Sequence, residues 1–245
     1  MKPTDFAKEI ERAAQEMGIG RRELFDSVVS FACTYMCMYA KKLSHLYSDI
    51  RFTRRMVWES EVKRVIVNAD DYVQKTSDLF MMLTQVMKAG EPFEDRLTAV
   101  YSEFLSGVAG QFMSPDNLGQ MLMRIMACDD PMDDSRLRTV SEPTCGTGAL
   151  ALGLLQDVYQ TKGKAGIAQI DLHLNDIDIR LIKIAMFQVM FHTIEHRVPL
   201  GRLVIECKNL ITEYQDNDRV IFTCRKTSGI EREMAILSEL AAAIG

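Results

Sequence analysis

The chain has 245 residues, of which 47% are hydrophobic and 26% are charged, with a formal net charge of −5. A chain of this length buries a sizeable core, as one large domain or two smaller ones. No apolar run is long enough to span a membrane, and the first residues, Met-Lys-Pro-Thr-Asp-Phe, lack the apolar stretch of a secretory signal. These features exclude a membrane-spanning protein and lead us to expect a cytoplasmic one.

The cysteines and the net charge narrow the class of protein further. None of the six cysteines forms a Cys-x-x-Cys pair, so neither a metal framework nor a disulfide framework is expected, and we expect no metal site. A net charge of −5 argues against a strong nucleic-acid-binding surface on this chain alone. Any affinity for DNA would need a local basic patch or a partner subunit.

The first part of the chain, residues 1–91, predicts a helical region. Apolar residues recur with helical spacing over 4–17, about 21–46 and 70–88, and glycines separate the first two segments. Basic residues surround the single tryptophan, Trp58, and we interpret them as a solvated helical face. The cluster consists of Arg51, Arg54, Arg55, Lys63 and Arg64.

A glycine-rich turn lies within Thr139–Leu150, where a short strand leads into an apolar helix. Gly146 and Gly148 lack a Cβ, so the backbone can turn sharply and a ligand can approach it closely. Glu142 at the strand end would repel a pyrophosphate but suits a cationic amino group, such as the ammonium of S-adenosylmethionine. The turn lacks the third glycine of the dinucleotide fingerprint. A tight strand-to-helix turn without a ligand is the alternative.

At these residues the chain resembles the N6-adenine DNA methyltransferases, especially the modification subunits of type I restriction systems. The family's turn is typically Asp-Pro-Ala-Cys-Gly-Thr-Gly-Gly, and this chain has Glu-Pro-Thr-Cys-Gly-Thr-Gly-Ala. The resemblance covers about Pro92 to Phe222 and implies a methyltransferase-like domain over 92–245 that binds S-adenosylmethionine. Four turn residues besides Glu142 would contact the cofactor, namely Thr144, Cys145, Gly146 and Gly148.

An earlier motif, Gly110-Gln-Phe-Met-Ser-Pro115, is similar to the family's Gly-Glu/Gln-Phe-Tyr-Thr-Pro. By that resemblance Phe112 supplies an apolar wall and Ser114 a polar contact at the methionine end of the cofactor. Pro115 would begin a helix that continues through Met126. The acidic run that follows has no metal-binding spacing and is interpreted as a solvated loop; it contains Asp129, Asp130, Asp133 and Asp134.

Two further strands, near 169–174 and 202–206, would extend the sheet. The second strand ends in Asn-Asp-Ile-Asp, where Asp176 takes the ribose role by resemblance, beside Ile177, and Asp178 caps the next helix. After the third strand, Lys208 occupies the slot of the family's adenine-binding Asp. Asn209 could accept there with a shift of one residue, whereas an ammonium could not.

A fourth strand, 219–222, should lead to the catalytic loop, and the resemblance implies a partial Rossmann-like α/β sheet in strand order 3-2-1-4. The family's loop is Asn/Asp-Pro-Pro-Tyr/Phe, which holds the target amine and stacks on the extruded base. This chain has Thr223-Cys-Arg-Lys-Thr-Ser228 there, with no Pro-Pro anywhere, and then a last helix over 229–244. Arg225 and Lys226 could touch nucleic-acid phosphate at the mouth of the site.

Two classes of function remain open. The first is a DNA adenine methyltransferase that is active with a partner or through an unrecognised loop. The second is a catalytically silent relative that binds S-adenosylmethionine and acts by protein association in restriction-modification or its regulation. For both classes we expect a homodimer or a partner subunit, and DNA contact through that partner.

Overall fold

The structure is a computed structural model, and it describes residues 1–59, 69–104, 137–213, 215–231 and 233. Several positions singled out in the sequence lie outside the described residues. They are Lys63, Arg64, Phe112, Ser114, Pro115 with its expected helix, the acidic run at 129–134, and most of the expected last helix.

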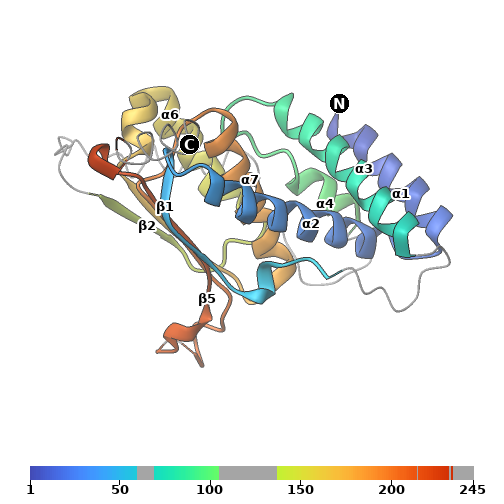
Figure 1. Ribbon diagram of the computed structural model, residues 1–245. Coiled ribbons are helices and arrows are strands. Elements are labelled where there is room, and N and C mark those ends of the chain that lie inside the picture. Colours follow the sequence, from blue (N-terminus) through green and yellow to red (C-terminus); the bar gives the residue numbers. More distant parts are fainter. Residues whose placement is uncertain (60–68, 105–136, 214, 232, 234–245) are drawn as a thin grey trace, which may run out of the picture.

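Within the described residues before the glycine-rich turn, the chain forms the helices α1 (Pro3–Met17), α2 (Arg21–Lys42), α3 (Ala69–Lys88) and the short α4 (Thr98–Phe104). Proline at the first position starts α1, and Gly18 ends it in the left-handed conformation with φ 69°. The helical periodicity of the sequence therefore predicted α1, α2 and α3. Together with α7 (Ile179–Glu195), which packs against α2, they form a helical layer (Figure 1).

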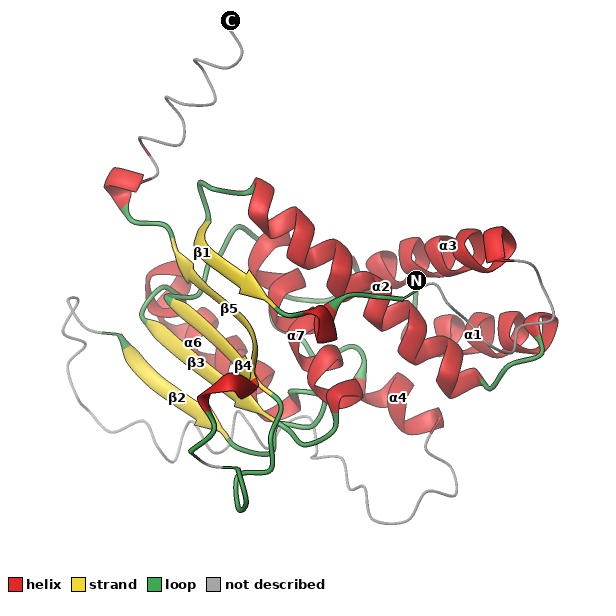
Figure 2. Ribbon diagram, turned by 60° about the horizontal axis from the view of Figure 1, so that its bottom comes forward, coloured by secondary structure: helices red, strands yellow, loops and turns green. Residues whose placement is uncertain are grey.

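The sheet has five strands in the order β1-β5-β4-β3-β2. Their bounds are β1 (Tyr47–Phe52), β2 (Arg138–Glu142), β3 (Ile170–Asn175), β4 (Arg202–Glu206) and β5 (Val220–Lys226). The three strands β2, β3 and β4 are parallel, while β5 and β1 are antiparallel to their neighbours. The chain therefore has a mixed α/β fold, and Figure 2 shows the five strands side by side in this order.

The expected strand order 3-2-1-4 is wrong. The predicted fourth strand, β5, pairs with β4 and runs antiparallel to it, instead of lying beside β2. In its described residues, the connection over 207–219 contains the 3₁₀ turn η2 (Asn217–Arg219) and no crossover helix. A parallel neighbour would need a crossover connection, usually a helix, to return the chain to the other end of the sheet.

Strand β1 was not expected, because it lies within the region predicted to be helical. Its register shifts between Ser48 and Arg51, and Asp49 in this bulge has φ 52°. The bulge interrupts the period-2 alternation that would have marked a strand. The N-terminal part of the chain thus forms helices and also adds an edge strand to the sheet.

Helices α6 (Ala149–Ile167) and α7 follow β2 and β3 and cover the same face of the sheet (Figure 1, Figure 2). Right-handed crossovers between adjacent parallel strands place consecutive helices in this way. The apolar core lies between this face and the helices, with Leu172, Leu203 and Phe222 fully buried. The carboxyl ends of β2, β3 and β4 therefore meet at one edge, which positions the site described next.

The 3₁₀ helix η1 (Arg54–Met56) follows β1, and its Arg55 contacts Cys207 directly after β4. Among the described helices, none is long and apolar enough to cross a membrane.

Candidate functional site

The turn after β2 contains two glycines that differ in their surroundings. Both have positive φ, 56° at Gly146 and 89° at Gly148. A Cβ on Gly148 would lie 3.0 Å from the Cβ and 3.2 Å from the Cα of Ala185 in α7, so this glycine allows the turn to pack on the helix. A Cβ on Gly146 would meet no atom within 4 Å. The backbone at Gly146 therefore borders open space that a ligand can enter.

The carboxylate of Asp176, at the end of β3, holds this turn. Its Oδ2 accepts a hydrogen bond from the Gly146 backbone N–H at 2.9 Å, and its Oδ1 accepts one from the Asp178 N–H at 2.9 Å. The residue is only 8% exposed. Each oxygen keeps a second lone pair for a further donor, so Asp176 shapes the turn and still has acceptor capacity.

The adjacent Asn175 links all three strand ends, a role that was not expected from the sequence. Its amide Nδ2 donates to the carbonyl oxygens of Pro143 at 2.9 Å and Lys208 at 3.1 Å, and its Oδ1 accepts from the Lys208 N–H at 3.1 Å. An amide side chain at the last position of a buried strand is the signal that could have revealed it. Asn175 keeps the loops after β2 and β4 at a fixed separation.

Glu142, the last residue of β2, forms no ion pair with another described residue. Its Oε2 is buried and accepts no hydrogen bond from the described part of the chain. Burial raises the pKa of Glu142 to about 7, a backbone hydrogen bond from Ala151 lowers it, and the charge of Asp176 raises it further. A buried acceptor without a partner is uncommon, and a cationic ligand beside Gly146 would donate the missing hydrogen bond to this oxygen.

The other predicted contact residues divide between surface and core. Thr144 is exposed on the turn, and Ile177 is 70% exposed directly after Asp176. Cys145 is buried; its backbone N–H donates to the Asn175 carbonyl at 2.8 Å. Burial raises the pKa of the Cys145 thiol well above its usual value. Ile177 and Thr144 can contact a ligand, whereas the Cys145 side chain belongs to the core.

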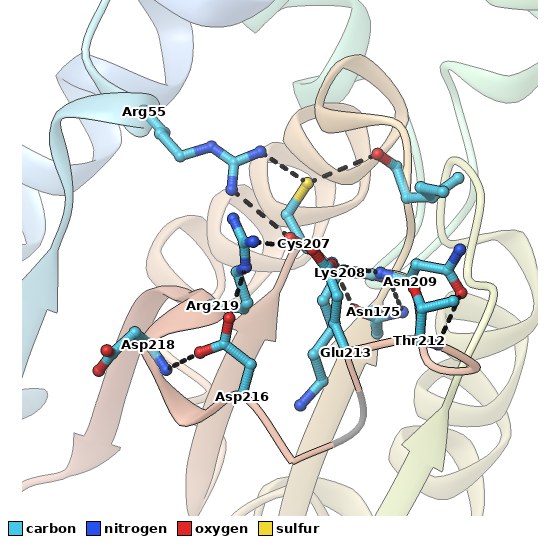
Figure 3. A network of polar contacts seen from close by, with 11 residues as sticks. Arg55, Asn175, Cys207, Lys208, Asn209, Thr212, Glu213, Asp216, Asp218 and Arg219 are labelled. Carbon is cyan, nitrogen blue, oxygen red and sulfur yellow. Dashed lines mark hydrogen bonds and ion pairs between the residues drawn. The ribbon is translucent and has the colours of Figure 1, made fainter.

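The residues after β4 lie close to this edge but are engaged in local contacts (Figure 3). Lys208 is buried, and its Nζ pairs with Glu206 at 2.8 Å. The Oδ1 of Asn209 accepts from the N–H groups of Ile211 at 3.0 Å and Thr212 at 3.4 Å. The amide oxygen that was expected to contact adenine thus caps a turn of its own chain.

The basic pair Arg225 and Lys226 does not lie at the mouth of this site. Because β5 is antiparallel to β4, Arg225 is in register with Arg202 at the start of β4, at the opposite edge of the sheet. Arg225 forms ion pairs with Asp49 at 2.6 Å and with Glu231. The expected loop over Thr223–Lys226 is part of β5, so this segment brings no residue to the glycine-rich turn.

Helix α7 supports the turn from behind. Gln188, which is fully buried, donates to the Thr147 carbonyl at 3.2 Å and accepts from the N–H groups of Arg96 at 3.0 Å and Leu97 at 3.1 Å. The hydroxyls of Thr147 and Thr98 share a hydrogen bond of 2.6 Å. These contacts fix the turn to the segment before α4, so its open side is preformed. In the described part of the chain, no three His, Cys, Asp or Glu side chains gather in a way that could hold a metal ion.

Comparison with known proteins gives limited matches. No protein-family model and no curated protein sequence matches the chain. Among solved structures, the chain is similar to a protein described as a modification subunit of a putative type I restriction enzyme from Vibrio vulnificus YJ016, with a TM-score of 0.46 and 12% identity. The similarity covers 89% of this chain and 58% of that one, so the chain spans less than two thirds of its length.

Proposed function

We propose that the chain binds S-adenosylmethionine at the carboxyl edge of β2 and β3, as a relative of the N6-adenine DNA methyltransferases. The observation that carries this proposal has two parts. One oxygen of Glu142 is buried and has no hydrogen-bond partner in the described part of the chain, and the backbone at Gly146 borders open space. An aminoacyl ligand offers an ammonium for the carboxylate and a narrow chain that passes a residue without a Cβ.

The remaining parts of the cofactor would fit the same edge. The ribose hydroxyls would donate to the unused lone pairs of Asp176, and the exposed Ile177 would pack against the adenine ring. The bound cofactor supplies an electrophilic methyl group, and the chain's own residues bind and orient it. Phe112, Ser114 and Pro115 keep their proposed role at the methionine end through the sequence resemblance alone.

We also propose that the chain divides into a helical N-terminal region, 1–91, and a methyltransferase-like domain, 92–245. This division locates the cofactor residues, because Glu142, Gly146 and Asp176 all belong to the second region. A net charge of −5 does not favour DNA binding by this chain alone, so DNA contact through a homodimer or partner subunit remains part of the same proposal.

Isothermal titration with S-adenosylmethionine tests binding. Gly146→Asn should abolish it, because asparagine tolerates positive φ and its side chain would fill the open space. Gly18→Asn is the matched control, since Gly18 has φ 69° at the end of α1, far from the site, and this variant should bind normally. No binding by the wild-type chain, or equal binding by Gly146→Asn, would refute the proposal.

The second candidate function, a catalytically silent relative, is favoured by the course of β5. The strand that follows β4 ends at the opposite edge of the sheet, so its last residues cannot hold a target amine beside the cofactor. We therefore expect no methyl transfer to DNA by the chain alone. The assay combines labelled S-adenosylmethionine with unmethylated DNA of mixed sequence; label on N6 of adenine above background, lost in Gly146→Asn, would show that the chain is an active enzyme.

A further inference from the structure

A cavity of about 620 Å³ lies between α2, the segment after β1, α3 and the start of α7. It is lined by charged, hydroxyl and aromatic side chains, and its volume is in the range of small-molecule sites. Lining residue Ile179 opens α7 directly after the strand-end run of β3, so the cavity is close to the carboxyl edge but is separate from the glycine-rich turn.

One side of the cavity offers hydrogen-bond donors. The Nζ of Lys183 donates to the Ser30 hydroxyl at 3.1 Å, which uses one of the three N–H donors of the ammonium. Burial lowers the pKa of Lys183, and the charges of Asp26 and Glu59 oppose that effect. Two ammonium donors therefore have no acceptor among the described residues and remain for a ligand.

Arg55 also lines the cavity, and its contacts with Cys207 after β4 hold it in place. Its guanidinium reaches the end of β4, where it donates to the Cys207 carbonyl at 3.5 Å and lies 3.1 Å from the Cys207 sulfur (Figure 3). These contacts fix the planar group at the cavity wall, and within the described part of the chain they leave it without a carboxylate in ion-pair contact. A fixed guanidinium with a lysine ammonium is a suitable pair of donors for a phosphate group.

Asp26, one helical turn before Ser30 on α2, offers an acceptor in the same cavity. Oδ1 of Asp26 is buried and accepts no hydrogen bond from the described residues. Burial raises the pKa of Asp26 to about 6, while the charges of Arg180 and Arg22 lower it, so the group is mostly ionised at neutral pH. A buried carboxylate oxygen in this position fits an amino group or ring N–H of a ligand.

An immobilised indole forms a third part of the wall. Trp58 donates its Nε1–H to the Ser27 hydroxyl at 2.8 Å and stacks on Tyr72 with ring centroids 6.1 Å apart and an interplanar angle of 18°. Phe31 packs edge-on against the indole, with ring centroids 5.1 Å apart. The basic residues around Trp58, interpreted from the sequence as a solvated helical face, therefore include two that border a cavity, Arg54 and Arg55.

We propose that this cavity binds a free nucleoside monophosphate whose base carries an amino group. The phosphate is held by Lys183 and Arg55, the amino group donates to Asp26, and the base packs against Trp58. The charged lining is balanced, with Glu23, Asp26 and Glu59 against Arg54, Arg55 and Lys183, and Arg54 and Glu59 form an ion pair with each other. The other charges suit a ligand that carries both an anionic group and a hydrogen-bond donor. This site does not depend on S-adenosylmethionine binding at the glycine-rich turn.

Trp58 is the only tryptophan in the chain, so its fluorescence reports on this cavity. Titration with AMP should change the Trp58 emission and saturate, while adenosine and inorganic phosphate should each bind at least about tenfold more weakly, because each makes only part of the contacts. UMP, which has no amino group, should also bind more weakly. The dinucleotide pApA should bind no more tightly than AMP; tighter binding would overturn the assignment to a free nucleotide.

Substitution of the lining residues tests which contacts hold AMP. Lys183→Met and Asp26→Asn should each weaken AMP binding about tenfold, by removal of one charged contact. Lys8→Met, on the exposed face of α1, and Gly146→Asn should leave the AMP response unchanged. Circular dichroism melting verifies that each variant is folded. No saturable change with AMP, or equal responses in wild type and folded Lys183→Met, would overturn the proposal, whatever the result with S-adenosylmethionine.

Discussion

The carboxylate of Asp176 accepts a hydrogen bond of 2.9 Å from the backbone N–H of Gly146, so the end of β3 holds the turn that follows β2. The second Asp176 oxygen is bonded to the Asp178 N–H, which begins the entry into α7. One side chain thus sets the shape of the turn and the start of the next helix. A residue with this structural role affects ligand binding even where it makes no contact with the ligand.

Replacement of Asp176 should therefore lower stability before any ligand is added. Asp176→Ala leaves two backbone N–H groups without their acceptor and should lower the free energy of unfolding by about 1–3 kcal/mol. Asp176→Asn keeps one acceptor oxygen and should cost less. Urea unfolding of the ligand-free protein measures both. Wild-type stability in Asp176→Ala would show that the two hydrogen bonds are not significant, and a loss of affinity in that variant could then be assigned to the ribose contact.

Gln188 is the buried connection between α7, the glycine-rich turn and the segment before α4. Gln188→Met keeps the volume but removes the acceptor of the Arg96 and Leu97 N–H groups. Because these groups are then buried without partners, we expect a loss of about 2–4 kcal/mol in the free energy of unfolding. Met190→Leu, two residues away and also fully buried, is the control and should cost less than about 1.5 kcal/mol. Equal effects would contradict the special role of Gln188.

The sequence predicted the local elements of this fold better than their pairing. Helical spacing indicated α1, α2 and α3, and the glycines of the turn with the apolar strands indicated β2, β3 and β4. These signals are carried by neighbouring residues. The antiparallel pairing of β5 with β4 and with β1 depends on contacts between residues far apart in the chain, which no local period encodes.

The same distinction applies to the candidate site. Glu142, Gly146 and Asp176 were expected together and lie together, because the carboxyl ends of adjacent parallel strands share an edge. The local contacts of Asn209 and the position of Arg225 could not be predicted from the sequence for a different reason. The role of each depends on its partners in the folded chain: the backbone N–H groups of Ile211 and Thr212 for Asn209, and Asp49 and Glu231 for Arg225.

Binding of S-adenosylmethionine should depend on pH through Glu142. Its pKa of about 7 in the free protein means that the carboxyl group is largely protonated at pH 6 and largely ionised at pH 8. If the carboxylate faces the ligand ammonium, affinity should rise about fivefold between these pH values and fall at higher pH as the α-amino group, with a pKa of about 8, loses its proton. Glu142→Gln should remove this dependence. A pH-independent wild-type affinity would place the ammonium elsewhere.

Ionisation of Glu142 should lower the stability of the free protein as the pH rises, although it should raise the affinity for the ligand. The folded pKa of Glu142 is raised above its unfolded value of about 4.5, so its contribution to stability is fully present below pH 4.5 and is lost as the pH rises through about 7. At pH 8, Glu142→Gln should therefore be more stable than wild type, by on the order of 2 kcal/mol. Urea unfolding at pH 5 and pH 8 measures the difference. A variant that is less stable than wild type at pH 8 would indicate that the carboxylate has a partner.

The two glycines of the turn should respond differently to the same substitution. Both have positive φ, so alanine costs about 1 kcal/mol at either position through backbone strain. Only at Gly148 does the added methyl also meet α7, at 3.0 Å from the Cβ and 3.2 Å from the Cα of Ala185. We expect Gly148→Ala to cost about 2–4 kcal/mol in total, because overpacking adds about 1–3 kcal/mol to the strain.

A double variant distinguishes crowding from strain. Ala185→Gly removes the Cβ that lies 3.0 Å from the new methyl, so in the Gly148→Ala background it should recover part of the lost stability, although glycine within α7 costs about 1 kcal/mol by itself. The double-mutant cycle, measured by urea unfolding, isolates the interaction between the two sites. An interaction energy near zero would mean that the turn moves away from α7 and that Gly148 is required only for its backbone conformation. A favourable interaction, together with a stable and non-binding Gly146→Asn, would assign Gly148 to packing and Gly146 to the ligand.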